Sequence, residues 1–233
     1  MYNDWRDEHR KVIDSFLEFL NKKSEEFILK GGTALLTCYN LDRFSEDIDL
    51  DSKSKRNIEK IIEDFCKKNS YTYTIPKNTD TTKRFMIQYN NEFKKLKVEV
   101  SYRRNNIKET EYTKINNTLV YNINELCLMK SMAYSGRDKI RDLYDICFIC
   151  NNYWNKLSDD VRNSLRVAFE YKGLEQFEFV VKDQKDELIN NEKLANDFIK
   201  VFDKLGLFSD IETEDKFEQH NAESDEDEEE DEL

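Results

Sequence analysis

The first half of the chain alternates between helical and strand-like spacing of its apolar residues. Apolar side chains recur every three to four positions over residues 3–23 and 55–69, which predicts two amphipathic helices. Short apolar or alternating runs predict strands at 27–29 and 47–51, with a short helix at 33–38 between them. Runs rich in Tyr, Thr, Ile, Phe and Val predict three more strands, at 71–75, 84–90 and 96–102.

The second half shows helical spacing only. Its pattern predicts helices at 123–135, 137–152, 159–171, 173–189 and 192–205. Asn122, with Glu125 three residues later, is a capping signal for the first of them. We therefore predict an α+β domain over residues 1–120 and a helical bundle domain over 121–209.

Charge separates a third region from these two. The chain has 233 residues, with 37 Lys and Arg, 49 Asp and Glu, and a formal net charge of −12. Residues 210–233 hold 14 of the acids and one base, which leaves 35 acids and 36 bases for residues 1–209. The predicted folded body is therefore nearly neutral, and dense like charge with few apolar residues predicts a disordered acidic tail at 210–233.

Composition excludes several classes of protein. No run approaches the roughly 20 apolar residues that span a bilayer, and the N-terminus carries no apolar signal core. Five cysteines without a secretory signal indicate free thiols of a reducing compartment. We expect a cytoplasmic protein that has no membrane partner.

The strongest candidate chemistry lies between residues 31 and 49. Asp47 and Asp49 are two positions apart in a predicted strand, so their carboxylates share a face. Like charges that close are unfavourable unless a cation neutralises them or one takes a proton, and Mg²⁺ prefers carboxylates together with phosphate oxygens. Gly31 and Gly32 end one strand and begin a helix, where backbone N–H groups can approach a triphosphate.

A third carboxylate would complete such a site. Glu99 lies between two apolar neighbours in the predicted strand 96–102, and it would face the aspartates if that strand lay beside 47–51. Taken singly, a Gly-Gly pair is usually a turn and an Asp-x-Asp pair a solvated strand edge. Their combination in this order is more specific.

Two segments resemble the AbiEii/AbiGii toxin family of the DNA polymerase beta-like nucleotidyltransferase superfamily. Residues 31–35 (Gly-Gly-Thr-Ala-Leu) and 43–50 (Arg-Phe-Ser-Glu-Asp-Ile-Asp-Leu) are similar to its first motif. Residues 130–145 are similar to a later motif, in which a helix Lys precedes an Arg-x-Lys-x-Arg-Asp-x-x-Asp run. The resemblance covers roughly residues 25–150, with both motifs in the expected order.

The resemblance implies a nucleotidyltransferase-like mixed sheet with flanking helices, followed by the helical bundle. It implies Mg²⁺ or Mn²⁺ as cofactor, with Asp47, Asp49 and, more loosely, Glu99 as metal ligands. It also implies a nucleoside triphosphate as substrate. The residues expected to bind the nucleotide are Gly31, Gly32, Thr33, Ser45, Lys130, Arg137 and Arg141. The residues expected to act in catalysis are Asp47, Asp49, Glu99, Lys130, Asp142 and Asp145.

The later motif has two interpretations. In the predicted helix 137–152, Asp138, Arg141, Asp142 and Asp145 form one polar stripe on an otherwise apolar helix. A charged stripe on a buried helix needs partners, so it could be an internal ion-pair network that joins the two halves. In the functional interpretation, Lys130 acts as a point charge on triphosphate oxygens and one aspartate orients it.

We therefore expect nucleotidyl transfer from a triphosphate to an acceptor hydroxyl, by a toxin paired with a cognate antitoxin protein. Some relatives use tRNA as acceptor, but the residues do not fix the acceptor. The alternatives are a non-catalytic nucleotide- or RNA-binding module on the same fold, and a metal-dependent nuclease. Nine bases interleaved with aromatics over residues 83–114 could form a nucleic-acid face or an ordinary exposed sheet face.

Overall fold

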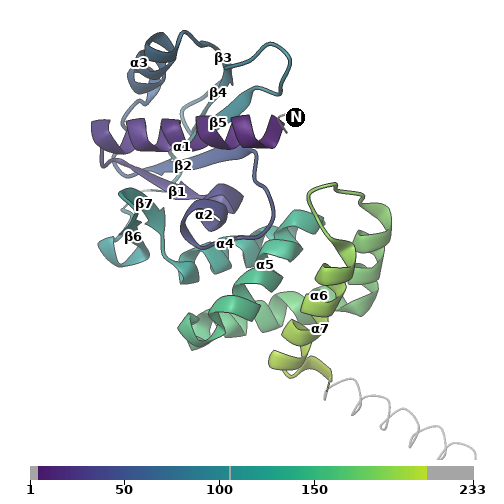
Figure 1. Cartoon of the computed structure of the whole chain (residues 1–233). Helices are drawn as coiled ribbons and strands as arrows, with labels where there is room; N and C mark the ends of the chain where they lie inside the picture. The colour runs from purple at the N-terminus through teal and green to yellow at the C-terminus, as the bar shows by residue number, and fades with distance from the viewer. Residues whose placement is uncertain (1–4, 105, 209–233) are drawn as a thin grey trace, which may run out of the picture. The chain divides into compact units, whose positions relative to one another are not determined.

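The computed structural model describes residues 5–104 and 106–208 (Figure 1). The chain divides into two compact units, one that ends at Lys130 and one that begins at Ser131. This division lies beyond the predicted domain boundary at 120/121, which stays a prediction. The predicted acidic tail at 210–233 lies outside the described residues.

The first unit is built on a seven-stranded sheet with the order β3-β4-β5-β2-β1-β7-β6. Strands β2 and β5 are parallel, as are β1 and β7, and the other neighbouring pairs are antiparallel. The strands are β1 Phe27–Lys30, β2 Asp47–Ser52, β3 Thr72–Asn78, β4 Thr82–Gln88, β5 Leu96–Ser101, β6 Tyr112–Ile115 and β7 Thr118–Tyr121. The predicted mixed sheet with flanking helices is therefore confirmed.

Alternation along the strands gives the sheet two different faces. Ile48, Phe85 and Val98 are fully buried on one face. Lys83 projects to the same side of β4 as Phe85 and pairs with Glu59 of α3. This pair shows that α3 lies on that face. The other face carries the polar residues of the same strands.

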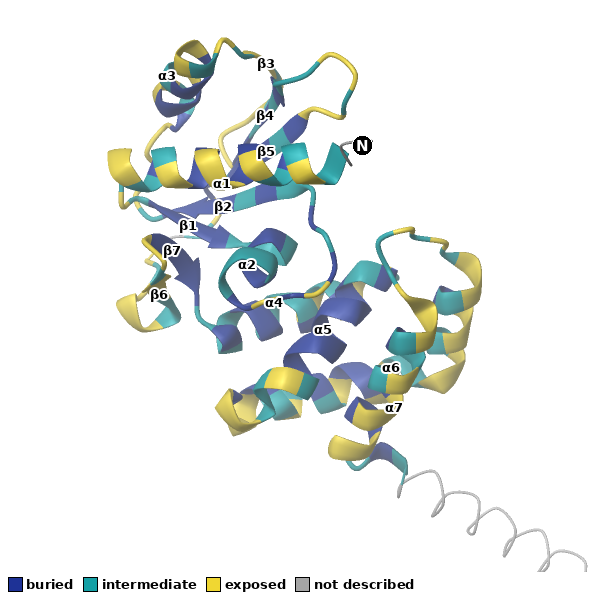
Figure 2. Cartoon of the chain, in the orientation of Figure 1, coloured by how far each residue is buried: buried dark blue, intermediate teal, exposed yellow. Residues whose placement is uncertain are grey.

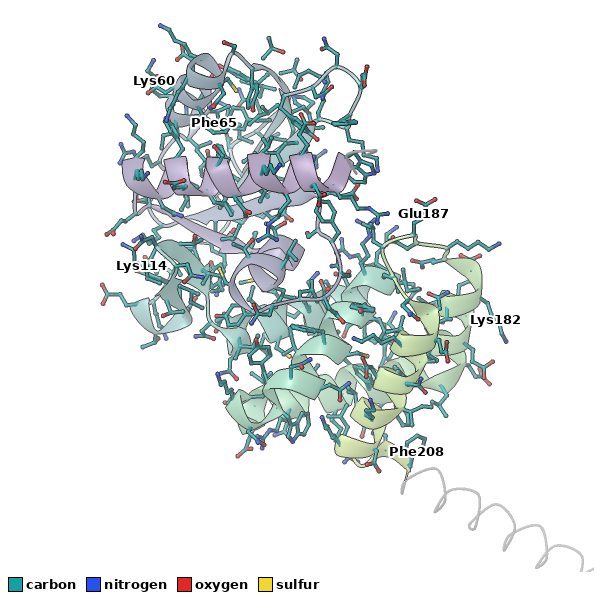
Figure 3. The ribbon with its side chains drawn as sticks, in the orientation of Figure 1. Lys60, Phe65, Lys114, Lys182, Glu187 and Phe208 are labelled. Atoms are coloured by element: carbon teal, nitrogen blue, oxygen red, sulfur yellow. The ribbon has the colours of Figure 1, made fainter. Side chains whose placement is uncertain are left out.

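Three helices accompany the sheet in this unit, namely α1 Trp5–Lys23, α2 Gly31–Cys38 and α3 Glu59–Asn69. The apolar side of α1 is buried, and Figure 2 shows its opposite side exposed. Phe16 of α1 and Phe65 of α3 meet edge to face with ring centroids 5.2 Å apart. Figure 3 shows Lys60 on the outer side of α3.

The β6–β7 hairpin was not predicted from the sequence. Its two-residue turn is Asn116-Asn117, with φ of 47° and 63°. Asn tolerates this left-handed region better than most residues, so the pair suits a tight hairpin turn. The flanking strands have only four residues each and give little periodicity to detect.

The second unit is helical, as predicted. Its helices are the end of α4 (Ile123–Gly136), then α5 Ile140–Tyr153, α6 Asp159–Asp183 and α7 Asn191–Lys204. The side-chain oxygen of Asn122 accepts a hydrogen bond from the Glu125 N–H at 3.0 Å, so the predicted cap of α4 is confirmed. Phe177 and Phe198 stack with centroids 3.9 Å apart in the core of this unit.

Two helix boundaries differ from the prediction. The predicted helix 137–152 begins at Ile140, because residues 137–139 are not helical and the Gln184 side chain accepts from the Ile140 N–H at 3.0 Å. The predicted break between helices 159–171 and 173–189 is confirmed, because Gly173 (φ +63°, ψ −179°) is not helical and divides α6 into two helical parts, but the second part ends at Asp183 and not at residue 189. Gln184 also donates to the Asp138 carbonyl, so a contact distant in sequence sets both boundaries.

Among the described residues, no helix combines the length and the apolar character needed to cross a bilayer.

Candidate active site

Three carboxylates lie on the polar face of the sheet. Asp47 and Asp49 project from β2 to the face opposite the buried Ile48. Strand β5 runs beside β2 and places Glu99 directly opposite Asp49. The predicted placement of these three residues on one face is therefore confirmed, and their roles stay predictions.

Gly31 and Gly32, at the start of α2, allow the chain to pass close to Asp49 and to the loop before β2. A Cβ atom on Gly31 would lie 3.1 Å from Oδ2 of Asp49, and Gly31 has φ of +76°. A Cβ atom on Gly32 would lie 2.8 Å from Oγ of Ser45 and 2.9 Å from Nη2 of Arg43. Only glycine allows both approaches without displacement of a neighbour.

The start of α2 is fixed to the end of the motif loop. The hydroxyl groups of Thr33 and Ser45 are hydrogen-bonded at 2.9 Å, and Thr33 also bonds to the Asp47 carbonyl. Lys30, the residue before the helix, gives no side-chain cap. The first N–H groups of a helix lack partners within the helix, which makes this end suitable for an anion.

His9 supports the motif loop from α1, and sequence reasoning did not assign it this role. It is buried, with Nε2 2.7 Å from the Glu46 carbonyl and Nδ1 2.6 Å from the Tyr89 hydroxyl. A carbonyl can only accept, so Nε2 carries a proton. The 37 positions between His9 and Glu46 leave no local sequence signal of this contact.

Two cations lie beside the carboxylates. Nζ of Lys97 is 2.6 Å from Oδ2 of Asp47, and the two residues are opposite each other in the β2–β5 register. Nε and Nη2 of Arg84 both lie 2.6 Å from Oε2 of Glu99. Neither Lys97 nor Arg84 was among the predicted site residues.

The surroundings of Asp49 shift its pKa. Burial is the largest cause and raises the pKa of Asp49. Lys97 opposes the rise, whereas the nearby charges of Asp47 and Glu99 add to it. Burial first, and the neighbouring acids second, thus disfavour the ionised form of Asp49, which a cation would stabilise.

A further buried acid follows on the same strand. Asp51 is almost fully buried, and it accepts hydrogen bonds from Nζ of Lys30 at 2.6 Å and from the Tyr121 hydroxyl at 2.9 Å. Lys30 is opposite Asp49 in the β1–β2 register. Asp51 thus holds a third cation at the edge of the site, through a contact that no local sequence pattern indicates.

The donor set fits a hard divalent cation in part. Asp47 and Asp49 supply carboxylate oxygens on one face, and burial, which raises the pKa of Asp49, makes its ionised form dependent on a nearby cation. Within residues 5–104 and 106–208, however, no group of three Asp, Glu, His or Cys side chains is gathered closely enough to hold a metal ion. Arg84 is the group that contacts Glu99 here, so Asp47 and Asp49 are the better-supported ligands.

The residues of the later motif lie on α4 and in the second unit. Lys130 is on α4, at the end of the first unit, and Arg137 precedes α5. The predicted stripe is therefore shorter than expected, since Asp138 is not helical. Arg137 pairs with the buried Asp142 at 2.8 Å.

The rest of that motif is also part of an ion-pair network. Arg141 pairs with Asp186 from the segment after α6, a partner that the sequence did not indicate. Asp145 is fully buried on α5. The Arg137–Asp142 and Arg141–Asp186 pairs lie within the second unit, in partial agreement with the ion-pair interpretation. The catalytic roles of Lys130, Asp142 and Asp145 stay predictions.

The bases of residues 83–114 do not form one face. Lys83 lies on the helix-covered face of the sheet with Glu59, whereas Arg84 lies on the opposite face with Glu99. Lys114, on the outer hairpin, pairs with Glu25. The arrangement favours the interpretation of this segment as an ordinary sheet.

Comparison with known proteins bears on the family and the fold of the chain. The family model described as the nucleotidyl transferase AbiEii toxin of type IV toxin–antitoxin systems matches residues 16–230. The crystal structure of JHP933 from Helicobacter pylori is similar, with 25% identity and a TM-score of 0.71, over 95% of this chain and 99% of that one. A candidate nucleotidyltransferase from H. pylori is 26% identical, with a TM-score of 0.69, over 88% and 98% of the two chains. A search of curated proteins gave no match.

Proposed function

The chain belongs to the AbiEii family of nucleotidyl transferase toxins, and from this premise we propose that it moves a nucleotidyl group from a nucleoside triphosphate to an acceptor hydroxyl at Asp47 and Asp49. The family is described as nucleotidyl transferases, which confirms the predicted enzyme class, and as toxins of type IV toxin–antitoxin systems. We further propose RNA such as tRNA as the acceptor, a cognate antitoxin protein as partner, and the cytoplasm as the location.

One observation carries the proposal. Oδ2 of Asp49 lies 3.1 Å from the position that a Cβ atom on Gly31 would occupy, so the acidic pair is next to the start of α2 on the polar sheet face. An anion at the helix and a cation at the carboxylates would therefore be neighbours. A nucleoside triphosphate with its divalent ion has this combination of charges.

To catalyse this reaction, the protein mainly has to position the reactants and neutralise developing charge. The acceptor oxygen forms a bond to the α-phosphorus while the bond to the bridging oxygen breaks and pyrophosphate leaves. Asp47 and Asp49 would hold Mg²⁺ or Mn²⁺, which supplies neutralisation of the charge on the attacking and leaving oxygens when it is bound. Gly31, Gly32 and Thr33 would direct backbone N–H groups at the phosphates, and Ser45 fixes Thr33.

The later motif would add positive charge. Lys130 and Arg137 are expected to bind triphosphate oxygens, with Arg141 as a further contact. Asp142 or Asp145 would orient Lys130 or the acceptor hydroxyl. For Glu99, its contact with Arg84 favours a role in holding that arginine over direct ligation of a metal ion.

The test is incorporation of label from each of the four nucleoside triphosphates into total RNA with Mg²⁺. We expect the wild type to extend RNA and Asp47→Asn to lose at least about a hundredfold in rate, since a charged ligand is removed. Asp80→Asn is the matched control. It makes the same chemical change away from the site, at an exposed residue in the β3–β4 turn.

Other outcomes would select the alternatives. Equal incorporation by wild type and Asp47→Asn would overturn the assignment of the site. Binding of triphosphate with no transfer to any acceptor would indicate a non-catalytic module. Shortened RNA, detected by mass, would indicate a nuclease that uses the same carboxylates.

A further inference from the structure

Lys97 is placed among the acidic residues of the proposed site. It is opposite Asp47 in the register and two positions before Glu99 on the same face of β5. Its ammonium group interacts electrostatically with Asp47, Asp49 and Glu99, and contacts Asp47 at 2.6 Å. A divalent cation at Asp47 and Asp49 would therefore lie close to this ammonium group.

The ion pair of Lys97 with Asp47 contributes little to folding. Its two side chains are 26% and 44% exposed, and ion pairs that are open to water add little to the free energy of unfolding. The packing role of β5 falls instead to Leu96, Val98 and Val100, which are fully buried on the other face. The position of Lys97 therefore needs an explanation other than core stability.

We propose that Lys97 is a resident counterion of Asp47 and Asp49, displaced when the divalent cation binds, whose ammonium group then contacts the phosphates of the nucleotide. This inference rests on the proposed function. Before loading, one positive charge offsets part of the repulsion between the carboxylates. After loading, the same charge lies near a metal ion, which repels it, and near a triphosphate, which attracts it.

The two interactions give Lys97 opposite effects on two ligands. Without its ammonium group, a divalent ion would meet less competition at Asp47 and would bind more tightly. The triphosphate would lose one cationic partner and bind more weakly. If Lys97 had a purely structural role, its substitution would weaken the binding of both the divalent ion and the triphosphate. If it contacted only phosphate, its substitution would leave the binding of the divalent ion unchanged.

The experiment measures both affinities for the full chain. Calorimetry with Mn²⁺ alone gives the metal affinity, and titration of a non-hydrolysable triphosphate at saturating Mn²⁺ gives the nucleotide affinity. For Lys97→Met we expect the metal dissociation constant to fall about fivefold and the nucleotide dissociation constant to rise about tenfold. Lys95→Met is the control. It removes the same charge from an exposed residue just before β5.

The outcomes separate this inference from the proposed function. If wild type and Asp49→Asn bind Mn²⁺ equally, the proposed metal site is wrong and the role of Lys97 with it. If Asp49→Asn loses Mn²⁺ but Lys97→Met binds it no more tightly than wild type, the site stands and the counterion role is overturned. A change of the same size in Lys95→Met would also overturn it.

Discussion

Gly31 and Gly32 are adjacent, yet different physical demands act on them. Gly31 needs its positive φ and lies under the carboxylate of Asp49, whereas Gly32 needs space for Ser45 and Arg43. Both demands come from residues more than ten positions away in the sequence. The glycine pair is thus part of the packing that positions the acids, in addition to any contact with phosphate.

We predict that Gly32→Ala lowers the free energy of unfolding by about 1–3 kcal/mol, because the new methyl group overlaps Ser45 Oγ. Incorporation of label into RNA should fall as well, since Ser45 moves relative to Thr33. Gly136→Ala is the control, because nothing lies within 4 Å of its Cβ position and alanine favours helix by up to about 1 kcal/mol. Denaturant unfolding of both variants measures the difference, and equal stability of the two would contradict the packing argument.

We predict that Asp49→Asn makes the protein more stable at pH 7 while it removes activity. The pKa of Asp49 is raised above its ordinary 3.8, chiefly by burial, so the carboxyl group supports folding when protonated. That contribution is complete below the ordinary pKa and is lost as pH rises through the raised value. Asparagine stays neutral, so the variant should exceed the wild type at pH 7 and match it near pH 4.

Thermal unfolding across this pH range measures the difference, with Asp80→Asn as a control that should show none. A variant less stable than wild type at pH 7 would contradict the prediction. Addition of Mg²⁺ at pH 7 should raise the unfolding temperature of wild type and leave that of Asp49→Asn unchanged, because only the native state with Asp49 binds the ion.

At the scale of single residues, the sequence could identify the acids but not their partners. Asp47 and Asp49 follow from strand alternation, and Glu99 follows once its strand is placed beside theirs. Lys97, Arg84 and the buried Asp51 were missed because cross-strand register assigns their roles, and no local pattern encodes register. His9 was missed for the same reason, since its partner is on a distant loop.

At the scale of elements, most helices and strands were predictable from periodicity, but the two strands of the β6–β7 hairpin were not. The helices α1 and α3 and the strand β2 carry enough periodicity to be read directly. The four-residue strands β6 and β7 do not. The start of α5 was misplaced because the Gln184 amide, 44 positions away, caps it.

The β6–β7 turn offers a test at this scale. Asn117 has φ of 63°, a region that glycine occupies without cost, so we predict that Asn117→Gly raises the unfolding temperature by about 1–3 °C. Asn117→Val should lower it, because a β-branched residue is strained at positive φ. Scanning calorimetry compares the three proteins, and a stabilising valine would show that the turn has a different conformation in solution.

At the scale of the whole molecule, charge is divided by region. Residues 210–233 hold 14 acids and one base, and the remainder of the chain is close to neutral. These residues lie outside the described part of the structure. A polyanionic acceptor such as RNA would be repelled by this segment over distances set by the salt concentration.

We predict that deletion of residues 210–233 strengthens the binding of total tRNA about tenfold at 50 mM salt, because net charge rises from −12 to about +1. The gain should shrink at 300 mM salt, where the Debye length is shorter. A full-length control in which the acids of 210–233 become Asn and Gln removes the charge and keeps the length. If this control binds like wild type while the deletion binds more tightly, the segment acts by steric exclusion and the electrostatic account is wrong.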